Sequence, residues 1–140
     1  MTSIPPPPGM PGSTAAGGAL RPVCFVDDDS AVRDSATLLL GAHGYDAIGH
    51  ASGADVLADH RRHEFACLIF DHHMPGMSGL DMLAALRREG SAVPAILITG
   101  RIDPYIRAGA QTLGVGAILE KPFSGIQLIE VVRAHLGRSA

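Results

Sequence analysis

From residue 21 onward, short apolar runs alternate with longer amphipathic segments, and this alternation limits the folds that the chain can adopt. Four apolar runs are almost continuous, which is typical of parallel strands buried on both faces. The remaining run, Tyr45–Gly49, includes Asp46 and suits the edge of a sheet. In chain order, the expected strands are Pro22–Val26, Tyr45–Gly49, Ala66–Phe70, Ala95–Thr99 and Gly116–Leu119.

Each apolar run is followed by a segment with helical spacing, and most of these segments begin at a residue suited to cap a helix. The expected helix-starting residues are Asp29 or Ser30, Ser52, Ser78, Asp103 and Ser124. Pro104 would take the first helical position after Asp103, where a proline costs no hydrogen bond. Five βα units in a row predict an α/β fold with a doubly wound open sheet and right-handed crossovers.

With 140 residues, of which 46% are apolar, the chain is long enough for one domain with a core. Residues 1–20 are rich in proline and glycine, so we expect a flexible tail before a domain at residues 21–140. The net charge of −3 gives no general attraction to nucleic acid. No apolar run approaches the roughly 20 residues that span a bilayer, so we expect no membrane segment.

The remaining charged and sulfur-containing residues carry little functional signal. Cys24 and Cys67 lie in apolar runs without metal-ligand spacing, which favours buried, reduced thiols in a cytoplasmic protein. The basic pairs Arg61-Arg62 and Arg87-Arg88 are interpreted as solvated helix ends.

Polar side chains follow four of the five expected strands. Asp27, Asp28 and Asp29 follow the first, Asp71 the third, Thr99 ends the fourth, and Lys121 follows the fifth. In open α/β sheets, ligands bind at the carboxyl ends of the strands, so we expect these side chains to meet at one edge. Two carboxylates about 4 Å apart repel by roughly 4 kcal/mol at an effective dielectric constant near 20. An acidic cluster of this kind therefore binds a proton or a cation.

Oxygen ligands favour a hard divalent ion, and Mg²⁺ commonly takes one or two carboxylates while it keeps waters and phosphate oxygens. A carboxylate can attack a phosphoryl group, while a lysine and a hydroxyl hold the oxygens that carry the charge. These residues predict that Asp71 attacks, that Lys121 and Mg²⁺ neutralise charge, and that Thr99 donates to a phosphoryl oxygen.

Four motifs, VDDDSAVR, FDHHMPGMSGL, ILITG and LEKPF, lie at these strand ends in that order. Over residues 21–138 the chain resembles the receiver domains of bacterial two-component response regulators, in particular those of nitrogen-fixation and LuxR-type regulators. The resemblance implies a flavodoxin-like fold with the sheet order 2-1-3-4-5. It identifies Asp71 as the phosphoacceptor and Thr99 and Lys121 as the hydroxyl and lysine of the site. It also implies a cis peptide bond between Lys121 and Pro122.

The resemblance implies a Mg²⁺ site beside the phosphoacceptor. Asp28 would bind the ion directly, Asp27 through water, Asp71 through its carboxylate and His73 through its backbone carbonyl. Because three aspartates follow one another, the metal-binding pair could be Asp27-Asp28 or Asp28-Asp29. We favour Asp27-Asp28 because Asp29 is placed to cap the first helix. We expect the His73 side chain to affect rates of phosphorylation or hydrolysis more than Mg²⁺ affinity.

The implied function is phosphorelay signal transduction by a regulatory protein, with no enzymatic activity beyond self-phosphorylation and autodephosphorylation. A sensor histidine kinase or a histidine phosphotransfer protein would supply the phosphoryl group. A conformational change would then signal to a partner protein, whose identity the sequence does not give. The resemblance leaves open whether phosphorylation also produces a dimer. Few residues follow the last helix, so we expect no output domain and no direct nucleic-acid contact, although similar receivers normally precede a DNA-binding domain.

The triplet Asp71-His72-His73 raises a first alternative. Asp-His-His phosphoesterases carry the same triplet after an apolar strand and use its imidazoles to bind catalytic metal ions. They are typically larger, and their pattern leaves Thr99 and the Lys121-Pro122 pair unexplained. A second alternative is a receiver-like interaction module that accepts no phosphoryl group, which the intact site residues disfavour.

Two further features bear on signalling. Ile118 stands where many receivers have a Phe or Tyr that moves inward with the hydroxyl residue, so Thr99 would move here without an aromatic partner. The helix expected from Asp103 to Leu113 contains Gly109 and only a thin apolar stripe, so its local stability is expected to be low. We predict that this helix and the segment Gly116–Leu136 form the signalling face.

Overall fold

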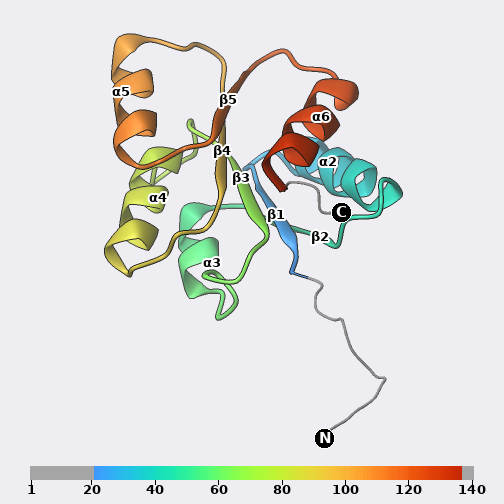
Figure 1. The fold of residues 1–140 in the computed structure, drawn as a ribbon, viewed down its shortest axis with the longest axis horizontal. Coiled ribbons are helices and arrows are strands. Elements are labelled where there is room, and N and C mark those ends of the chain that lie inside the picture. Colours follow the sequence, from blue (N-terminus) through green and yellow to red (C-terminus); the bar gives the residue numbers. More distant parts are fainter. Residues whose placement is uncertain (1–20, 137–140) are drawn as a thin grey trace, which may run out of the picture.

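The computed structural model describes residues 21–136, which are built around one five-stranded parallel sheet (Figure 1). The strands are β1 (Val23–Val26), β2 (Ala47–His50), β3 (Cys67–Asp71), β4 (Ala95–Thr99) and β5 (Ala117–Glu120). They lie in the order β2-β1-β3-β4-β5, which confirms the expected order. The tail expected at residues 1–20 and the chain end at 137–140 lie outside the described residues.

Helices cover both faces of the sheet, as expected for a doubly wound fold (Figure 1). They are α2 (Ser30–Ala42), α3 (Gly53–Ala58), α4 (Gly79–Arg88), α5 (Pro104–Thr112) and α6 (Gly125–Leu136). Helices α2 and α6 lie on one face, and α3, α4 and α5 lie on the other. Within residues 21–136, no helix has both the length and the apolar character needed to cross a membrane.

The central strands supply the core on both faces of the sheet. Every residue of β1, β3 and β4 is buried, as their continuous apolar sequences predict. Successive side chains of β1 alternate, because Cys24 packs in the cluster under α3, α4 and α5 while Phe25 packs in the cluster under α2 and α6. Cys24 and Cys67 are buried free thiols on opposite faces, and burial raises the pKa of both.

The two outer strands are less buried than the central three. Strand β2 lies at one edge of the sheet, as the sequence Tyr45–Gly49 predicted. The expectation that Gly116–Leu119 is buried on both faces was wrong, since Leu119 is the only buried residue of β5. Strand β5 pairs with β4 alone and forms the other edge, where one side of the strand has no neighbour in the sheet.

The helices begin where the sequence predicted. Asp29 caps α2 by accepting from two backbone N–H groups, and Ser52, Ser78 and Asp103 each cap their helix by accepting from one. Pro104 occupies the first turn of α5. These caps fix the helix starts close to the carboxyl ends of the strands, and thus determine where the connecting loops lie.

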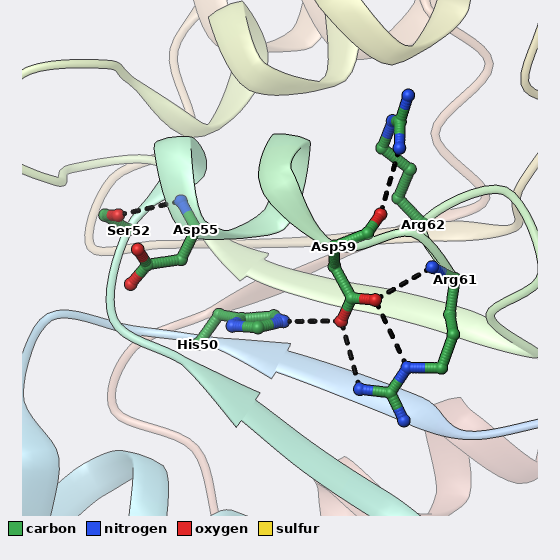
Figure 2. A network of polar contacts seen from close by, with 6 residues as sticks. All are labelled: His50, Ser52, Asp55, Asp59, Arg61 and Arg62. Atoms are coloured by element: carbon green, nitrogen blue, oxygen red, sulfur yellow. Dashed lines mark hydrogen bonds and ion pairs between the residues drawn. The ribbon is translucent and has the colours of Figure 1, made fainter.

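The basic pairs are not simply solvated helix ends, so that interpretation was wrong for three of the four arginines. Figure 2 shows His50 and Arg61 pointing toward the carboxylate of Asp59, whose side chain is only 5% exposed. Arg62 donates to the Asp59 carbonyl and to the Glu89 carboxylate, which joins the turn after α3 to the end of α4.

Arg87 is the third of these arginines. Its guanidinium donates to the carbonyls of Leu113, Ser91 and Val93 and thereby ties the end of α4 to the end of α5. Arg88 is exposed, as the interpretation requires. Arginine has five N–H donors in a fixed arrangement, which allows one side chain to bind carbonyl groups from distant segments.

Candidate functional site

The sheet register brings the predicted site residues to one edge. Val26 pairs with Phe70, so the next residues, Asp27 and Asp71, leave adjacent strands at the same level. In β4 and β5, Thr99 pairs with Glu120, which places Lys121 just beyond the same level. The carboxyl ends of β1, β3, β4 and β5 therefore supply two aspartates, a threonine and a lysine to one rim.

Lys121 and Asp71 form the central contact of this rim. The Lys121 ammonium lies 2.6 Å from Oδ2 of Asp71, and the Asp71 side chain is only 6% exposed. The Lys121 backbone N–H donates to the Thr99 carbonyl, and the Lys121–Pro122 peptide bond is cis, as expected. Burial lowers the pKa of Lys121, but the hydrogen bond to Asp71 and attraction to nearby aspartates outweigh it, so the pKa is raised overall.

The loop after β3 fixes the other oxygen of Asp71. Oδ1 accepts from the His73 backbone N–H at 3.1 Å, and His72 is held by backbone hydrogen bonds to Ile98 and Gly79. A Cβ atom on Gly79 would lie 2.5 Å from the carbonyl oxygen of Asp71. Only a glycine therefore lets the start of α4 approach the end of β3 this closely.

The acidic loop after β1 provides three different environments. Asp27 is 2% exposed, and its Oδ1 accepts from the Asp29 N–H, while its Oδ2 is buried without a hydrogen-bond partner. Asp28 is exposed, and Asp29 caps α2 as predicted. Burial raises the pKa of Asp27, and the charges of Asp71 and Asp28 raise it further. The loop thus presents one buried carboxylate oxygen in need of a proton or a cation.

The oxygens of the acidic loop suit Mg²⁺, which does not need a site made entirely of side chains. Among residues 21–136, no group of three or more His, Cys, Asp and Glu side chains could hold a metal ion. Mg²⁺ instead takes one or two carboxylates and keeps several waters. The partnerless Oδ2 of Asp27, beside the charged groups of Asp28 and Asp71, matches that requirement.

The histidines of the triplet do not form a metal-binding cluster with Asp71. Their rings contact each other edge to face, with centroids 5.0 Å apart. His72 is 9% exposed, and its Nδ1 is buried without a hydrogen-bond partner. The pKa of His72 is lowered, mainly by burial and to a smaller extent by the charge of His73. Within residues 21–136, no group of three or more metal-binding side chains includes these two imidazoles.

The sequence did not predict the contacts of two side chains near the rim, Thr99 and Arg33. Thr99 is fully buried, and its hydroxyl donates to the Arg101 carbonyl at 3.1 Å and accepts from the Arg101 N–H at 3.3 Å. Arg33 was missed as a site residue, although it ends the motif VDDDSAVR. Its Nη1 donates to the backbone carbonyl of Asp27 at 2.6 Å.

The sequence is similar to curated bacterial regulatory proteins over most of its length. The transcriptional regulatory protein FixJ of Azorhizobium caulinodans is 40% identical over 119 residues, which cover 85% of this chain and 56% of that protein. The C4-dicarboxylate transport transcriptional regulatory protein DctR of Rhodobacter capsulatus is 38% identical, over 84% of this chain and 63% of that protein. The chain therefore spans less than two thirds of the length of these relatives.

A structural comparison and a family model complete the assignment. The chemotaxis protein CheY4 of Vibrio cholerae matches with a TM-score of 0.77 and 26% identity, over 84% of this chain and 99% of that one. The expected flavodoxin-like fold is thereby confirmed. Residues 23–133 match the family model of the response regulator receiver domain. The chain belongs to the receiver domain family of two-component response regulators.

Proposed function

We propose that the chain accepts a phosphoryl group on the carboxylate of Asp71 and signals by the conformational change that follows. The observation that carries this proposal is the 2.6 Å contact between the Lys121 ammonium and the Asp71 carboxylate, next to the acidic loop. A nucleophilic carboxylate beside a fixed positive charge suits phosphoryl transfer, which depends mainly on positioning and on electrostatic stabilisation.

The transfer uses the chain's own residues in separate roles. An Asp71 carboxylate oxygen attacks phosphorus and forms an acyl phosphate, while the bond from phosphorus to the donor breaks and the donor keeps its electron pair. Lys121 shifts its ammonium from Asp71 toward a phosphoryl oxygen and balances the negative charge there. The Thr99 hydroxyl exchanges its bond to Arg101 for a bond to another phosphoryl oxygen, which alters the loop before α5.

The acidic loop would hold Mg²⁺ beside this carboxylate. Asp28 would bind directly, Asp27 through water, Asp71 through its carboxylate, and His73 through its backbone carbonyl. When bound, the ion supplies positive charge that lowers the repulsion between the carboxylates and an incoming phosphoryl group. The His73 side chain would then affect the rates of phosphorylation and hydrolysis by controlling access.

The proposed phosphoryl transfer also indicates the class of phosphoryl donor and the class of downstream partner. A sensor histidine kinase or a histidine phosphotransfer protein would donate the phosphoryl group, and the chain itself would use small phosphoryl donors and hydrolyse its own acyl phosphate. The downstream partner would be a protein, without direct contact of this domain with nucleic acid. We place the exchange in the cytoplasm, where thiols such as Cys24 and Cys67 stay reduced.

The test is the intact mass of the protein after incubation with acetyl phosphate and Mg²⁺. The wild type should gain one phosphate that is stable in acid and labile in base, and Asp71→Asn or chelation of Mg²⁺ should abolish the gain. Equal gain in Asp71→Asn would contradict the assignment of Asp71. No gain in any sample from acetyl phosphate or from a phosphorylated histidine donor would favour the interaction module that accepts no phosphoryl group.

A further inference from the structure

Arg33 contacts the acidic loop from the side of helix α2. It lies in the first half of the helix and is partly buried, with its Nη1 donating to the Asp27 carbonyl oxygen at 2.6 Å. A hydrogen bond from a charged donor is about twice as strong as one between neutral groups. The contact therefore holds one particular peptide group, the one that joins Asp27 to Asp28.

That peptide group orients both carboxylates of the proposed magnesium site. The Asp27 N–H donates to the His50 carbonyl at 3.1 Å, and Oδ1 of Asp27 accepts from the Asp29 N–H at 2.9 Å. With its carbonyl held by Arg33, Asp27 has every polar group engaged except Oδ2, which is buried and partnerless. A rotation of the Asp27–Asp28 peptide would move Asp28 relative to this oxygen.

Strand β2 contains Gly49 at the position where the side chain of Arg33 packs against the strand. A Cβ atom built on Gly49 would lie 2.8 Å from Cγ and 2.9 Å from Cδ of Arg33. Such distances force the stem of the arginine to move, and the stem sets where the guanidinium lies. Gly49 has no positive φ, so its backbone accepts an alanine and the close approach of Arg33 is the reason for glycine at this position.

We propose that Arg33 is a positioning residue for the magnesium site and that Gly49 provides the space through which it reaches Asp27. The inference rests on the proposed function, because it assumes that the acidic loop binds Mg²⁺. Arg33 acts on the metal through the Asp27–Asp28 peptide and does not contact the ion. Residues that hydrogen-bond to a metal's ligands typically change affinity by about 10-fold to 100-fold when they are mutated.

The sign of the effect separates positioning from simple electrostatics. Removing the positive charge of Arg33 reduces repulsion of a cation, so a purely electrostatic role predicts tighter Mg²⁺ binding in Arg33→Ala. Loss of positioning predicts weaker binding instead. Gly49→Ala keeps the charge and displaces the stem, so it tests positioning without altering the net charge.

The experiment is a Mg²⁺ titration of ¹⁵N-labelled protein, in which amide chemical shifts of the loops after β1 and β3 give the dissociation constant. Arg33→Ala and Gly49→Ala should each weaken binding about tenfold. The double variant should be no weaker than Arg33→Ala alone, because Gly49 acts through the arginine. Arg133→Ala, which removes an exposed arginine from α6, is the matched charge control and should bind like the wild type.

Each outcome bears on a different statement. Unchanged or tighter binding by Arg33→Ala would overturn the role of Arg33, and additive losses in the double variant would overturn the role of Gly49. Absence of shifts around both loops in the wild type would overturn the proposed magnesium site and this inference with it. Urea midpoints of all variants show whether each is folded at the titration temperature, and a folded Gly49→Ala keeps the inference testable if Arg33→Ala unfolds.

Discussion

Gly79 and Gly41 form a matched pair on which the packing at the site can be tested. Both lie in helices with ordinary backbone angles, but their surroundings differ. A Cβ atom on Gly79 would lie 2.5 Å from the Asp71 carbonyl oxygen and 2.5 Å from Cδ2 of Phe70, whereas a Cβ atom on Gly41 would meet nothing within 4 Å. The same substitution should therefore have opposite effects at the two positions.

The magnitudes follow from these contacts. Alanine at an unobstructed helical position gains roughly 0.5–1 kcal/mol over glycine, so Gly41→Ala should raise the free energy of unfolding by about that amount. Overpacking typically costs about 1–3 kcal/mol, and at Gly79 the obstructing oxygen belongs to the backbone and cannot rotate away. At such an immovable contact the upper part of that range applies, about 2–3 kcal/mol, and subtracting a gain of about 1 kcal/mol leaves Gly79→Ala less stable by about 1–2 kcal/mol.

Equilibrium unfolding in urea measures both changes. With a slope of about 2 kcal/mol per molar urea, the midpoint should fall by roughly 0.5–1 M in Gly79→Ala and rise by roughly 0.25–0.5 M in Gly41→Ala. Gly79→Ala should also slow phosphorylation from acetyl phosphate, because the displaced backbone is that of Asp71. A midpoint for Gly79→Ala at or above that of the wild type would refute the steric argument.

Three further substitutions probe charged contacts. Lys121→Met should reduce the rate of phosphorylation from acetyl phosphate about a hundredfold, measured by intact mass, because it removes the charge beside Asp71. Asp59→Asn should lower the urea midpoint near neutral pH, with a difference from the wild type that shrinks as the pH falls below about 4. The hydrogen bond from Arg61 holds the Asp59 pKa below its unfolded value, so this stabilisation is present above the unfolded pKa and lost in acid. Arg87→Met should cost about 1–3 kcal/mol in the same urea assay, since carbonyls of Val93 and Leu113 lose their donor; an unchanged midpoint would contradict this.

The fold was predictable because its signals are local or periodic. Apolar runs located the strands, and polar residues such as Asp29 and Asp103 located the helix starts. The strand order came from resemblance, because periodicity does not say which strands are neighbours. The partial exposure of β5 was missed for a related reason, since an apolar sequence such as that of Gly116–Leu119 does not show whether a strand has one neighbour or two.

Most residues of the candidate site could be predicted from the sequence, but their contacts could not. Each strand end contributes a residue type with a recognisable chemistry, so Asp71, Thr99 and Lys121 could be listed from the sequence. Arginine contacts with backbone carbonyls leave no such signal, because any residue supplies a carbonyl and the partner depends on the tertiary structure. The roles of Arg33 and Arg87 therefore became visible only in three dimensions.

The most direct test of Asp71 as the phosphoacceptor locates the phosphoryl group within the chain. Borohydride reduces an aspartyl phosphate to homoserine, and peptide mass spectrometry then identifies the converted residue. After reaction with a phosphorylated histidine donor and Mg²⁺, homoserine should replace aspartate at position 71 and at no other aspartate of the chain. Conversion at Asp27 or Asp28 with position 71 unchanged would contradict the assignment, as would phosphate bound to a histidine of the chain.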